Sequence, residues 1–325
     1  MQKIEKLLQK RAAELLAEGT VERVLAWQAG EFFYDNAPAV VSSADECDKL
    51  VYNEFCPANL CKYLIETSHA GKKTAVFLKP CDTYGVNQLL KDNRIKRELV
   101  YAIGTPCSGM LDINKIKAAG VKGIISVSVD GDEVVVNTAY GEKRLVKADV
   151  LLNKCLMCKG AAYKIADEEL AEPLPVPQFT GDKFAKVKEI EAMSPEERFS
   201  FWQSELSKCI RCNACRDICP ACSCEQCIFD KPDTPVAGKA HADEVEEQMY
   251  HIIRAFHVAG RCTGCGECNR ACPMGIPVGA LKLQMGRVVK KLFEYAPGMD
   301  VDAVPPLLGF QLEEKNIHEH HIEGA

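Results

Sequence analysis

Apolar and polar positions in the first half of the chain alternate between helical and strand-like spacing. Residues 1–19 predict an amphipathic first helix, with Ile4, Leu7, Leu8, Leu15 and Leu16 at its apolar positions. Later apolar runs have the length of buried strands, and helical segments follow the last two of them. The runs are residues 21–27, 74–78 and 99–103, and the helical segments are 83–90 and 113–119. This alternation predicts an α/β domain with a mostly parallel sheet covered by helices.

A hairpin is predicted within the same domain. Two strand-like runs, residues 124–129 and 133–137, flank Asp130-Gly131, a dipeptide typical of tight hairpin turns. We expect an antiparallel element that decorates the α/β domain, most simply as a sheet edge without chemistry.

The second half of the chain has a different pattern. Residues 171–182 form a polar, proline-containing stretch that we take as the domain boundary, and only helices are predicted beyond it. Ser194 caps a helix that has Pro195 at its first position and Glu197 completing a capping box. Two further helices are expected over 242–259, with an apolar stripe of Val245, Met249, Ile252, Ile253 and Phe256, and over 278–293. The expected units are domains over 1–174 and 183–295, and an arm over 296–325 that is disordered or lies over a partner.

Composition narrows the class of protein. Of the 325 residues, 47% are hydrophobic, which excludes a disordered chain. The 40 basic and 46 acidic side chains leave a net charge of −6, which disfavours a nucleic-acid or anionic-membrane partner. The first 19 residues are charged throughout, unlike a secretory signal, and no apolar stretch reaches the ~18–20 residues that span a bilayer. We expect a soluble cytoplasmic protein, in which dense cysteine motifs bind metals or act in redox chemistry more often than they form disulfides.

The cysteines carry the strongest chemical signal. Thirteen of the 18 lie between Cys155 and Cys272, and one motif occurs twice. The run Cys209-x2-Cys212-x2-Cys215-x3-Cys219-Pro220 recurs as Cys262-x2-Cys265-x2-Cys268-x3-Cys272-Pro273. At this spacing three thiolates hold one 4Fe-4S cluster and the fourth reaches the other cluster, whereas paired zinc sites explain neither the third cysteine nor the Cys-Pro ending. We assign one cluster to Cys209, Cys212, Cys215 and Cys272, and the other to Cys262, Cys265, Cys268 and Cys219.

This region resembles a known electron-transfer domain. Residues 207–292 carry the duplicated motif, a helical stripe between its halves and the ending Pro273-Met274-Gly275-Ile276-Pro277. These features resemble the α-helical ferredoxin domain of succinate dehydrogenase and heterodisulfide reductase electron-transfer subunits. The resemblance implies an all-α dicluster ferredoxin domain whose two clusters pass electrons one at a time.

A third cysteine motif, Cys222-x-Cys224-x2-Cys227, follows the first copy directly. It could hold another cluster if a fourth thiolate came from Cys47, Cys56 or Cys61 across the domain interface. The alternatives are spare buried thiols or a small structural site, because a buried free cysteine behaves as a small hydrophobe.

Four cysteines of the front domain follow predicted strands. Cys81 follows residues 74–78, Cys107 follows 99–103, and Cys155-x2-Cys158 follows an apolar run at 150–152. Because open α/β sheets bind ligands at the carboxyl ends of their strands, these four thiolates could converge on one cluster. Two buried core cysteines and an unrelated CxxC pair are the alternative.

Residues 1–174 resemble the beta-subunit family of coenzyme F420-reducing hydrogenase and formate dehydrogenase. The resemblance rests on the opening helix, residues 72–81, residues 103–109 and the CxxC pair, in the family's order and spacing. In that family the domain holds FAD beside a 4Fe-4S cluster and exchanges a hydride with a deazaflavin or a nicotinamide. The resemblance implies cluster ligands at Cys81, Cys107, Cys155 and Cys158, and flavin contacts at Lys79, Thr83, Gly104 and Thr105.

The chain also departs from that family. Leu78-Lys79 stand where the family has Gly-Thr, and the leading ferredoxin segment is absent, with cluster motifs at the C-terminal side instead. No GxGxxG or Walker sequence marks a nucleotide site. His318, His320 and His321 match no metal motif and are assigned to a solvated tail.

Together these features predict an iron–sulfur flavoprotein subunit of a multisubunit oxidoreductase. It would convert two-electron hydride transfer with NAD(P)H or F420 into single-electron transfer with partner subunits of a hydrogenase, formate dehydrogenase or electron-bifurcating complex. The alternatives are a flavin-free 4Fe-4S relay subunit, a heterodisulfide-reductase-like thiol catalyst and a zinc-stapled interaction protein. Lys154 and Lys159 beside the CxxC pair either raise the potential of that cluster or are ordinary surface lysines. No catalytic residue is assigned.

Overall fold

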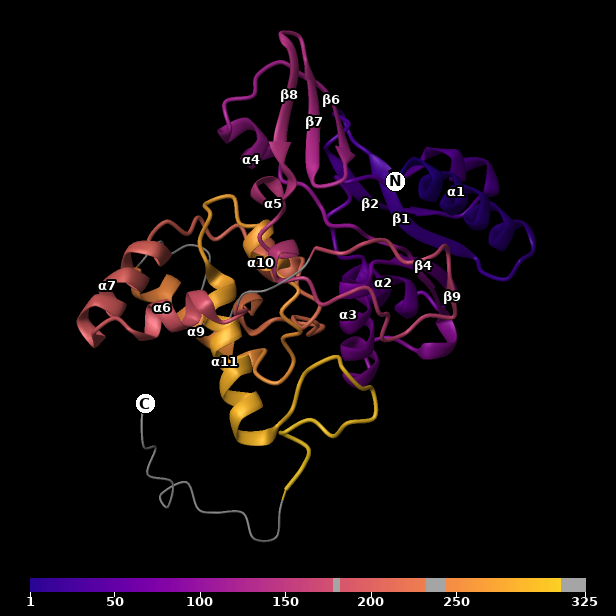
Figure 1. The fold of residues 1–325 in the computed structure, drawn as a ribbon. Helices are drawn as coiled ribbons and strands as arrows, with labels where there is room; N and C mark the ends of the chain where they lie inside the picture. The colour runs from indigo at the N-terminus through magenta and orange to yellow at the C-terminus, as the bar shows by residue number, and fades with distance from the viewer. Residues whose placement is uncertain (178–181, 232–243, 311–325) are drawn as a thin grey trace.

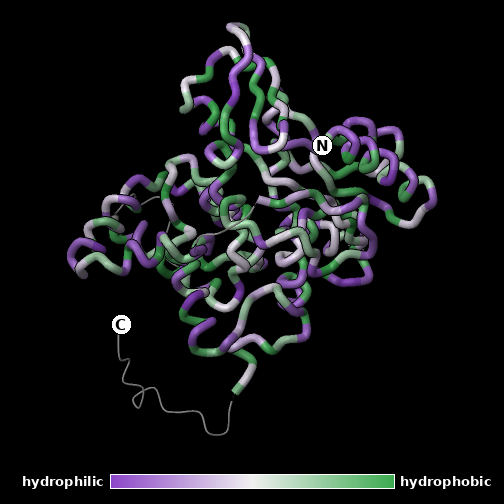
Figure 2. The backbone as a smooth tube through the Cα atoms, viewed as in Figure 1, coloured by the Kyte–Doolittle hydropathy of each residue, from purple (hydrophilic) through white to green (hydrophobic). Residues whose placement is uncertain are grey.

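The computed structural model describes residues 1–177, 182–231 and 244–310. An α/β part comes first in the chain, a small antiparallel sheet projects from it, and a helical part contains the C-terminal elements (Figure 1). Hydrophobic stretches run through the interior of the α/β part, whereas the projecting sheet and the outer helices alternate hydrophobic and hydrophilic residues (Figure 2). None of the helices in these described ranges is long and apolar enough to cross a membrane.

The main sheet is mixed, so the expected mostly parallel sheet is confirmed only in part. Its strands are β1 (Arg23–Ala29), β2 (Asn36–Val41), β3 (Leu50–Val51), β4 (Thr74–Leu78), β5 (Val100–Gly104) and β9 (Glu168–Glu169). β1, β4, β5 and β9 are parallel neighbours in that order, whereas β2 and β3 pair antiparallel with β1. The reason is the short link between β1 and β2, because a tight turn joins antiparallel strands and a parallel pair needs a longer crossover.

Helices and short 3-10 turns cover this sheet and carry the loops of the site. In chain order they are α1 (Gln2–Ala17), η1 (Ala44–Lys49), η2 (Cys61–Tyr63), α2 (Leu64–His69), α3 (Pro80–Lys91), η3 (Arg97–Leu99), α4 (Ile113–Ala118), α5 (Lys147–Val150) and η4 (Cys155–Met157). β4 is buried at all five positions and leads directly into α3, which Pro80 begins. The predicted order of a strand followed by a helix is therefore confirmed for β4 and α3, which carry Cys81 of the site.

Buried aromatic residues fix the loops that follow the strands. Trp27 and Tyr52 are fully buried, and each donates a hydrogen bond to a backbone carbonyl oxygen of a loop. The Trp27 indole N–H donates to the Ala58 carbonyl oxygen at 3.2 Å, and the Tyr52 hydroxyl donates to that of Pro106 at 2.9 Å. Because Pro106 precedes Cys107, the second bond holds one cysteine loop against the core.

The predicted hairpin is confirmed, but it belongs to a separate sheet. β6 (Ile124–Asp130), β7 (Glu133–Thr138) and β8 (Gly141–Val146) pair antiparallel in that order. Asp130 and Glu133 face each other across the turn, where Gly131 has a positive φ of 60°. The buried Val134 and Val136 of β7 pack on Ile116 of α4, so this sheet has a small core of its own.

The second half is helical, as predicted, and no strand occurs in the described ranges 182–231 and 244–310. Its elements are α6 (Ala185–Glu191), α7 (Pro195–Leu206), α8 (Ala214–Asp217), η5 (Ile228–Asp230), α9 (Glu244–His257), α10 (Glu267–Arg270) and α11 (Val278–Phe293). Ser194 and Glu197 form the expected capping box at the start of α7. Part of the expected boundary, residues 178–181, lies outside the described residues.

The predicted apolar stripe of α9 faces outward. Val245 and Phe256 are 65% and 62% exposed, whereas Glu247, His251 and Arg254 are buried. The helix therefore turns its polar face toward the interior. On that side of the helix, His251 and Arg254 contact thiols and Glu247 pairs with Arg211.

The beginning of the expected C-terminal arm lies on the front domain of the same chain. The Asn87 amide of α3 donates to the Gly298 carbonyl oxygen at 3.3 Å, and the Lys91 ammonium donates to the Tyr295 hydroxyl at 3.2 Å. Residues 311–325, which include His318, His320 and His321, lie outside the described residues.

The first helix gives a direct test of the packing. Leu8 is fully buried, whereas its neighbour Leu7 is 42% exposed. We expect Leu8→Ala to lower the free energy of unfolding by about 2–5 kcal/mol, because it leaves a cavity in the core. Leu7→Ala should cost about 0.5 kcal/mol in the same anaerobic urea titration. Equal losses for the two variants would contradict this packing of α1.

Candidate functional site

Three loops of the front domain bring four cysteines to one cavity. Cys81 lies at the start of α3 after β4, Cys107 follows β5, and Cys155 and Cys158 belong to η4 and its end. All four line the same cavity at the carboxyl ends of the strands, and Cys265 of the second cysteine motif lines it as well. The arrangement gathers five sulfur atoms from loops far apart in the sequence.

The local backbone directs amide hydrogens at two of these sulfurs. The Gly109 N–H donates to Cys107 Sγ at 3.4 Å, and the Met110 N–H donates to Cys155 Sγ at 3.3 Å. Such bonds stabilise a thiolate that binds a metal. Burial raises the pKa of Cys107 to about 12 and that of Cys81 well above its ordinary value, so both thiols are neutral until a metal displaces their protons.

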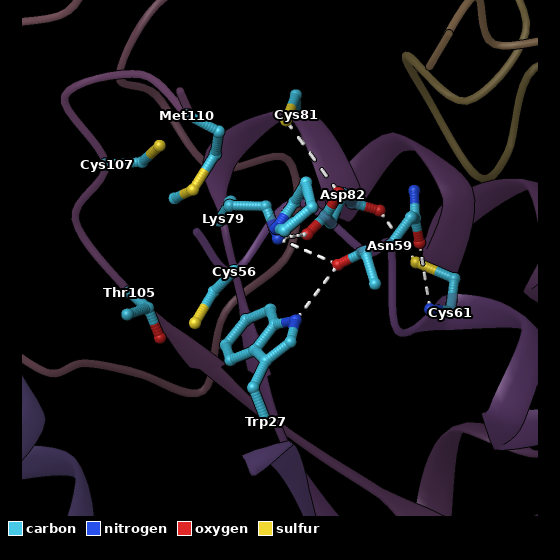
Figure 3. Close-up of polar contacts among 12 residues, drawn as sticks. Trp27, Cys56, Asn59, Cys61, Lys79, Cys81, Asp82, Thr105, Cys107 and Met110 are labelled. Carbon is cyan, nitrogen blue, oxygen red and sulfur yellow. Dashed lines mark hydrogen bonds and ion pairs between the residues drawn. The ribbon is translucent and has the colours of Figure 1, made fainter. Parts of the chain in front are cut away.

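The residues expected to contact a flavin are engaged inside the protein. Lys79 lies 2.8 Å from the Asp82 carboxylate, donates to the Ala58 carbonyl oxygen at 2.9 Å, and sits 4.2 Å from the centre of the Trp27 ring. Figure 3 shows its amino group turned toward Asp82, with the Trp27 indole beside it. Both charges are almost fully buried, so they form a structural pair.

The other three expected flavin residues are also covered. The Thr83 hydroxyl donates to the Pro80 carbonyl oxygen at 2.7 Å, and Thr105 is fully buried. A Cβ at Gly104 would lie 2.9 Å from the Tyr163 ring, so Tyr163 occupies the space against this glycine. These three residues therefore contact other groups of the protein, and their expected role as flavin contacts stays a prediction.

The two copies of the duplicated motif share one backbone conformation. Arg211 and Asn213 have φ values of 53° and 63°, and Gly264 and Gly266, at the same places in the second copy, have 68° and 74°. The Arg211 N–H donates to Cys209 Sγ at 3.4 Å, and Gly264 makes the equivalent backbone bond to Cys262. Left-handed residues turn successive amides inward, so both loops are shaped to surround a sulfur-bound anionic group.

The fourth cysteine of each copy packs toward the other copy. Cys272 packs in one group with Cys209, Cys215 and Cys268, whereas Cys219 packs in another with Cys262. Each fourth cysteine thus lies beside cysteines of the other copy, as crossed ligation requires, although Cys268 shares the first group.

Buried polar groups of α9 and α11 approach the same sulfurs. Arg254 donates to Cys215 Sγ at 3.0 Å, and His251 Nε2 lies 3.3 Å from Cys209 Sγ. Burial and the Arg254 charge lower the pKa of His251 to about 3, so its ring is neutral. Burial alone would lower the pKa of Lys282, but Cys268 and Cys219 raise it above its usual value.

Sequence reasoning missed these groups, although the sequence contained a signal. Glu247, His251 and Arg254 have helical spacing and share the face opposite the apolar stripe. Glu247 pairs with Arg211 at 3.0 Å, and Glu247, His251 and Cys209 lie within 4.8 Å of one another. The inward polar face of α9 is therefore explained by the thiols and the loop it contacts.

Two lysines beside the CxxC pair clamp the second motif to the front domain. Lys154 forms an ion pair with Glu267, and Lys159 donates to the Thr263 carbonyl oxygen. Glu267 also pairs with Arg270 at 2.7 Å. Although burial alone would raise the pKa of Glu267, Lys154 and Arg270 lower it to about 2. The interpretation of these lysines as ordinary surface groups is wrong, because both are withdrawn into the contact between the two halves.

The third cysteine motif does not meet the thiolate expected from the front domain. Cys222, Cys224 and Cys227 line a separate cavity that contains none of Cys47, Cys56 and Cys61. Cys61 instead donates to the Asp82 carbonyl oxygen at 2.9 Å. The lining of this cavity therefore gives no support to a fourth ligand from Cys47, Cys56 or Cys61.

The clamp predicts a large difference between two glutamates that both join the halves. Glu267→Ala leaves the buried Lys154 without its carboxylate, and we expect it to lower the free energy of unfolding by about 3–5 kcal/mol. Glu225, 76% exposed and 3.3 Å from Arg94, is the control, and Glu225→Ala should cost less than about 1 kcal/mol. Anaerobic urea titration measures both. A loss below about 1 kcal/mol in the free energy of unfolding of Glu267→Ala would show that the Lys154–Glu267 pair does not stabilise the protein.

Comparisons with known proteins agree with this geometry. Residues 205–276 match the 4Fe-4S dicluster domain family. The chain is 26% identical over 355 aligned residues to F420-dependent formate dehydrogenase subunit beta of Methanocaldococcus jannaschii, covering 91% of this chain and 92% of that protein. It is 25% identical to F420-dependent formate dehydrogenase 1 subunit beta of Methanococcus maripaludis, covering 91% and 90%.

One solved structure is also similar in part. A chain of the xenon-derivatised F420-reducing [NiFe] hydrogenase complex from Methanosarcina barkeri matches with a TM-score of 0.41 and 15% identity, over 54% of this chain and 69% of that one. The formate dehydrogenase relatives match along nearly their whole length. The chain is therefore similar along nearly its whole length to beta subunits of F420-dependent formate dehydrogenase, and it contains a region that matches the 4Fe-4S dicluster domain family.

Proposed function

We propose that this chain carries electrons between a hydride carrier, F420 or NAD(P)H, at its front domain and redox partner subunits at its helical domain. One observation carries the proposal: Cys81, Cys107, Cys155 and Cys158 share a cavity with Cys265 of the dicluster region. Electron transfer between centres needs them close together, and this contact places the two thiol sets side by side. The partner subunits are those of a formate dehydrogenase, a hydrogenase or an electron-bifurcating complex.

Three 4Fe-4S clusters form the conducting path in this proposal. The first is held by Cys81, Cys107, Cys155 and Cys158, the second by Cys262, Cys265, Cys268 and Cys219, and the third by Cys209, Cys212, Cys215 and Cys272. Amide bonds to sulfur, the repeated loop conformation and the crossed packing of Cys219 and Cys272 support these ligand sets. The path ends at Cys212, the exposed member of the third set.

We place FAD in a second cavity, beside the front thiols. Four lysines line it, no aspartate or glutamate does, and three aromatic rings complete it. The lysines are Lys159, Lys183, Lys282 and Lys290, and the rings belong to Tyr84, Phe184 and Tyr295. This donor set fits a planar group that carries a diphosphate. Cys158 and Gly264 line both cavities, so a flavin there would lie next to the first and second clusters.

The residues of this chain have distinct tasks in that arrangement. Bound FAD would accept a hydride and release its two electrons singly. Lys183, whose pKa is lowered by burial and by Lys290, would hold the phosphates. Lys159 lies 4.0 Å from the centre of the Tyr84 ring and fixes that ring at the edge of the cavity. Arg254 and Lys282 place positive charge beside the dicluster sulfurs, which favours the reduced clusters.

Anaerobic purification of the whole chain tests this function. We expect clusters and flavin in the isolated protein, and bleaching of the cluster absorbance on addition of reduced F420 or NAD(P)H. The double variant Lys183→Met/Lys290→Met should weaken flavin binding at least about tenfold, because one charge-assisted contact contributes about 1.5 kcal/mol. Lys186→Met is the control, since Lys186 is exposed and pairs with Glu189 instead. Clusters without flavin would select the flavin-free relay, and an iron-free protein would refute electron transfer altogether.

Crossed ligation gives a separate prediction. Cys272→Ser should remove the same electron paramagnetic resonance signal as Cys212→Ser, because we assign both residues to one cluster. Cys219→Ser should match Cys265→Ser in the same way. A match between Cys272→Ser and Cys265→Ser would instead show that each motif holds its own cluster with all four of its cysteines.

A further inference from the structure

Three cysteines outside the proposed clusters line one cavity of about 150 Å³. Cys222, Cys224 and Cys227 share it with Lys62 of the front domain and with the last turn of α9. No helix or strand is present over 222–227. The shape of this loop is therefore not set by regular secondary structure. Three of its six residues are cysteines.

The exposure of these thiols separates them from the structural cysteines. Cys47, Cys56 and Cys61 are buried, whereas Cys224 is exposed and Cys227 is half-buried. A cysteine that serves only as a small hydrophobe is buried. The spare-thiol interpretation therefore fits the three front-domain cysteines and does not fit this loop.

The spacing of the sulfurs favours a cluster over a single ion. Tetrahedral zinc, with Zn–S bonds of about 2.3 Å, holds sulfurs about 3.8 Å apart. Among the residues that the structure describes, only Cys209, Glu247 and His251 place three potential ligand atoms all within 4.8 Å of one another. The sulfurs of Cys222, Cys224 and Cys227 do not all lie within that distance of one another, and neither do three sulfurs of either duplicated motif. A larger inorganic group suits all three sets.

The charges around the cavity favour an anionic occupant. The Lys62 ammonium donates to the Cys222 carbonyl oxygen, and Arg254 Nη2 lies 3.6 Å from Cys222 Sγ. One cation comes from each half of the protein, and both lie beside the same cysteine. A thiolate-bound iron–sulfur cluster is negatively charged as a whole, so both cations stabilise it.

We propose that Cys222, Cys224 and Cys227 bind a fourth iron–sulfur cluster, completed by a ligand that is not cysteine. His257 lines the same cavity and offers a ring nitrogen for this position. The inference rests on the proposed function, because the Cys222 side chain lies within hydrogen-bond distance of that of Cys219, a proposed ligand of the second cluster. Cys219 and Cys222 would thus bring the two centres together, and one electron would pass from the second cluster, which would be oxidised, to the new centre, which would be reduced. Exposed Cys224 then makes it a second outlet to a one-electron protein partner.

The test compares matched double variants of the whole chain, purified anaerobically. Cys224→Ala/Cys227→Ala should lose about four iron atoms per chain and one paramagnetic signal, with the other signals unchanged. Cys47→Ala/Cys56→Ala, which removes two buried thiols elsewhere, should keep the full iron content. His257→Ala should alter the signal of the new centre alone, and an unchanged signal would overturn His257 as its ligand.

A measurement on the unmodified protein makes the test independent of folding defects. Native anaerobic alkylation with iodoacetamide should leave Cys222, Cys224 and Cys227 unlabelled until the iron is removed by a chelator. Labelling of these cysteines in protein that retains its other clusters overturns the proposal, as does zinc in place of iron, or unchanged iron in the Cys224→Ala/Cys227→Ala variant. A wild-type protein without any iron refutes the proposed function itself.

Discussion

The buried ion pair between Lys154 and Glu267 is the contact on which the arrangement of the two halves depends. Lys154 precedes a front-domain cysteine and Glu267 precedes Cys268, so the pair joins the two thiol regions directly. Removing two charges from water is costly, and only close pairing offsets that cost. A shifted interface would leave Lys154 in the interior without its carboxylate, while Glu267 would keep only its pair with Arg270. The pair therefore selects one relative position of the halves, whatever its net contribution to stability.

The loop next to this pair is shaped by the same contact. A Cβ at residue 266 would lie 2.7 Å from the Lys154 Cβ, and Gly266 also has a positive φ, so a side chain is excluded twice over. In the first copy of the motif the same place is Asn213, whose side-chain oxygen accepts a hydrogen bond from the Tyr250 hydroxyl. The duplicated loops thus share a backbone and differ where one of them meets the front domain.

The sequence predicted local structure well and long-range contacts poorly. The β4 run, α11 and the Ser194 capping box follow from short-range patterns and match the structure. The burial of Lys154 could not be predicted, because its partner lies 113 residues away. The same holds for Gly104: its expected role came from a resemblance, and the ring that covers it belongs to Tyr163, in a segment without regular pattern.

The polar face of α9 points inward because of the chemistry of its neighbours. Hydrophobicity alone would bury Val245 and Phe256, yet the interior beside α9 contains thiols and the charged Arg211. A buried arginine needs an anion, and thiolates held by a metal supply one where neutral thiols do not. The inward Arg254 is therefore best compensated when the adjacent sulfurs are charged. Under the proposed function the sulfur sites are charged when they hold clusters, and the inward polar face leaves the apolar stripe of α9 on the surface.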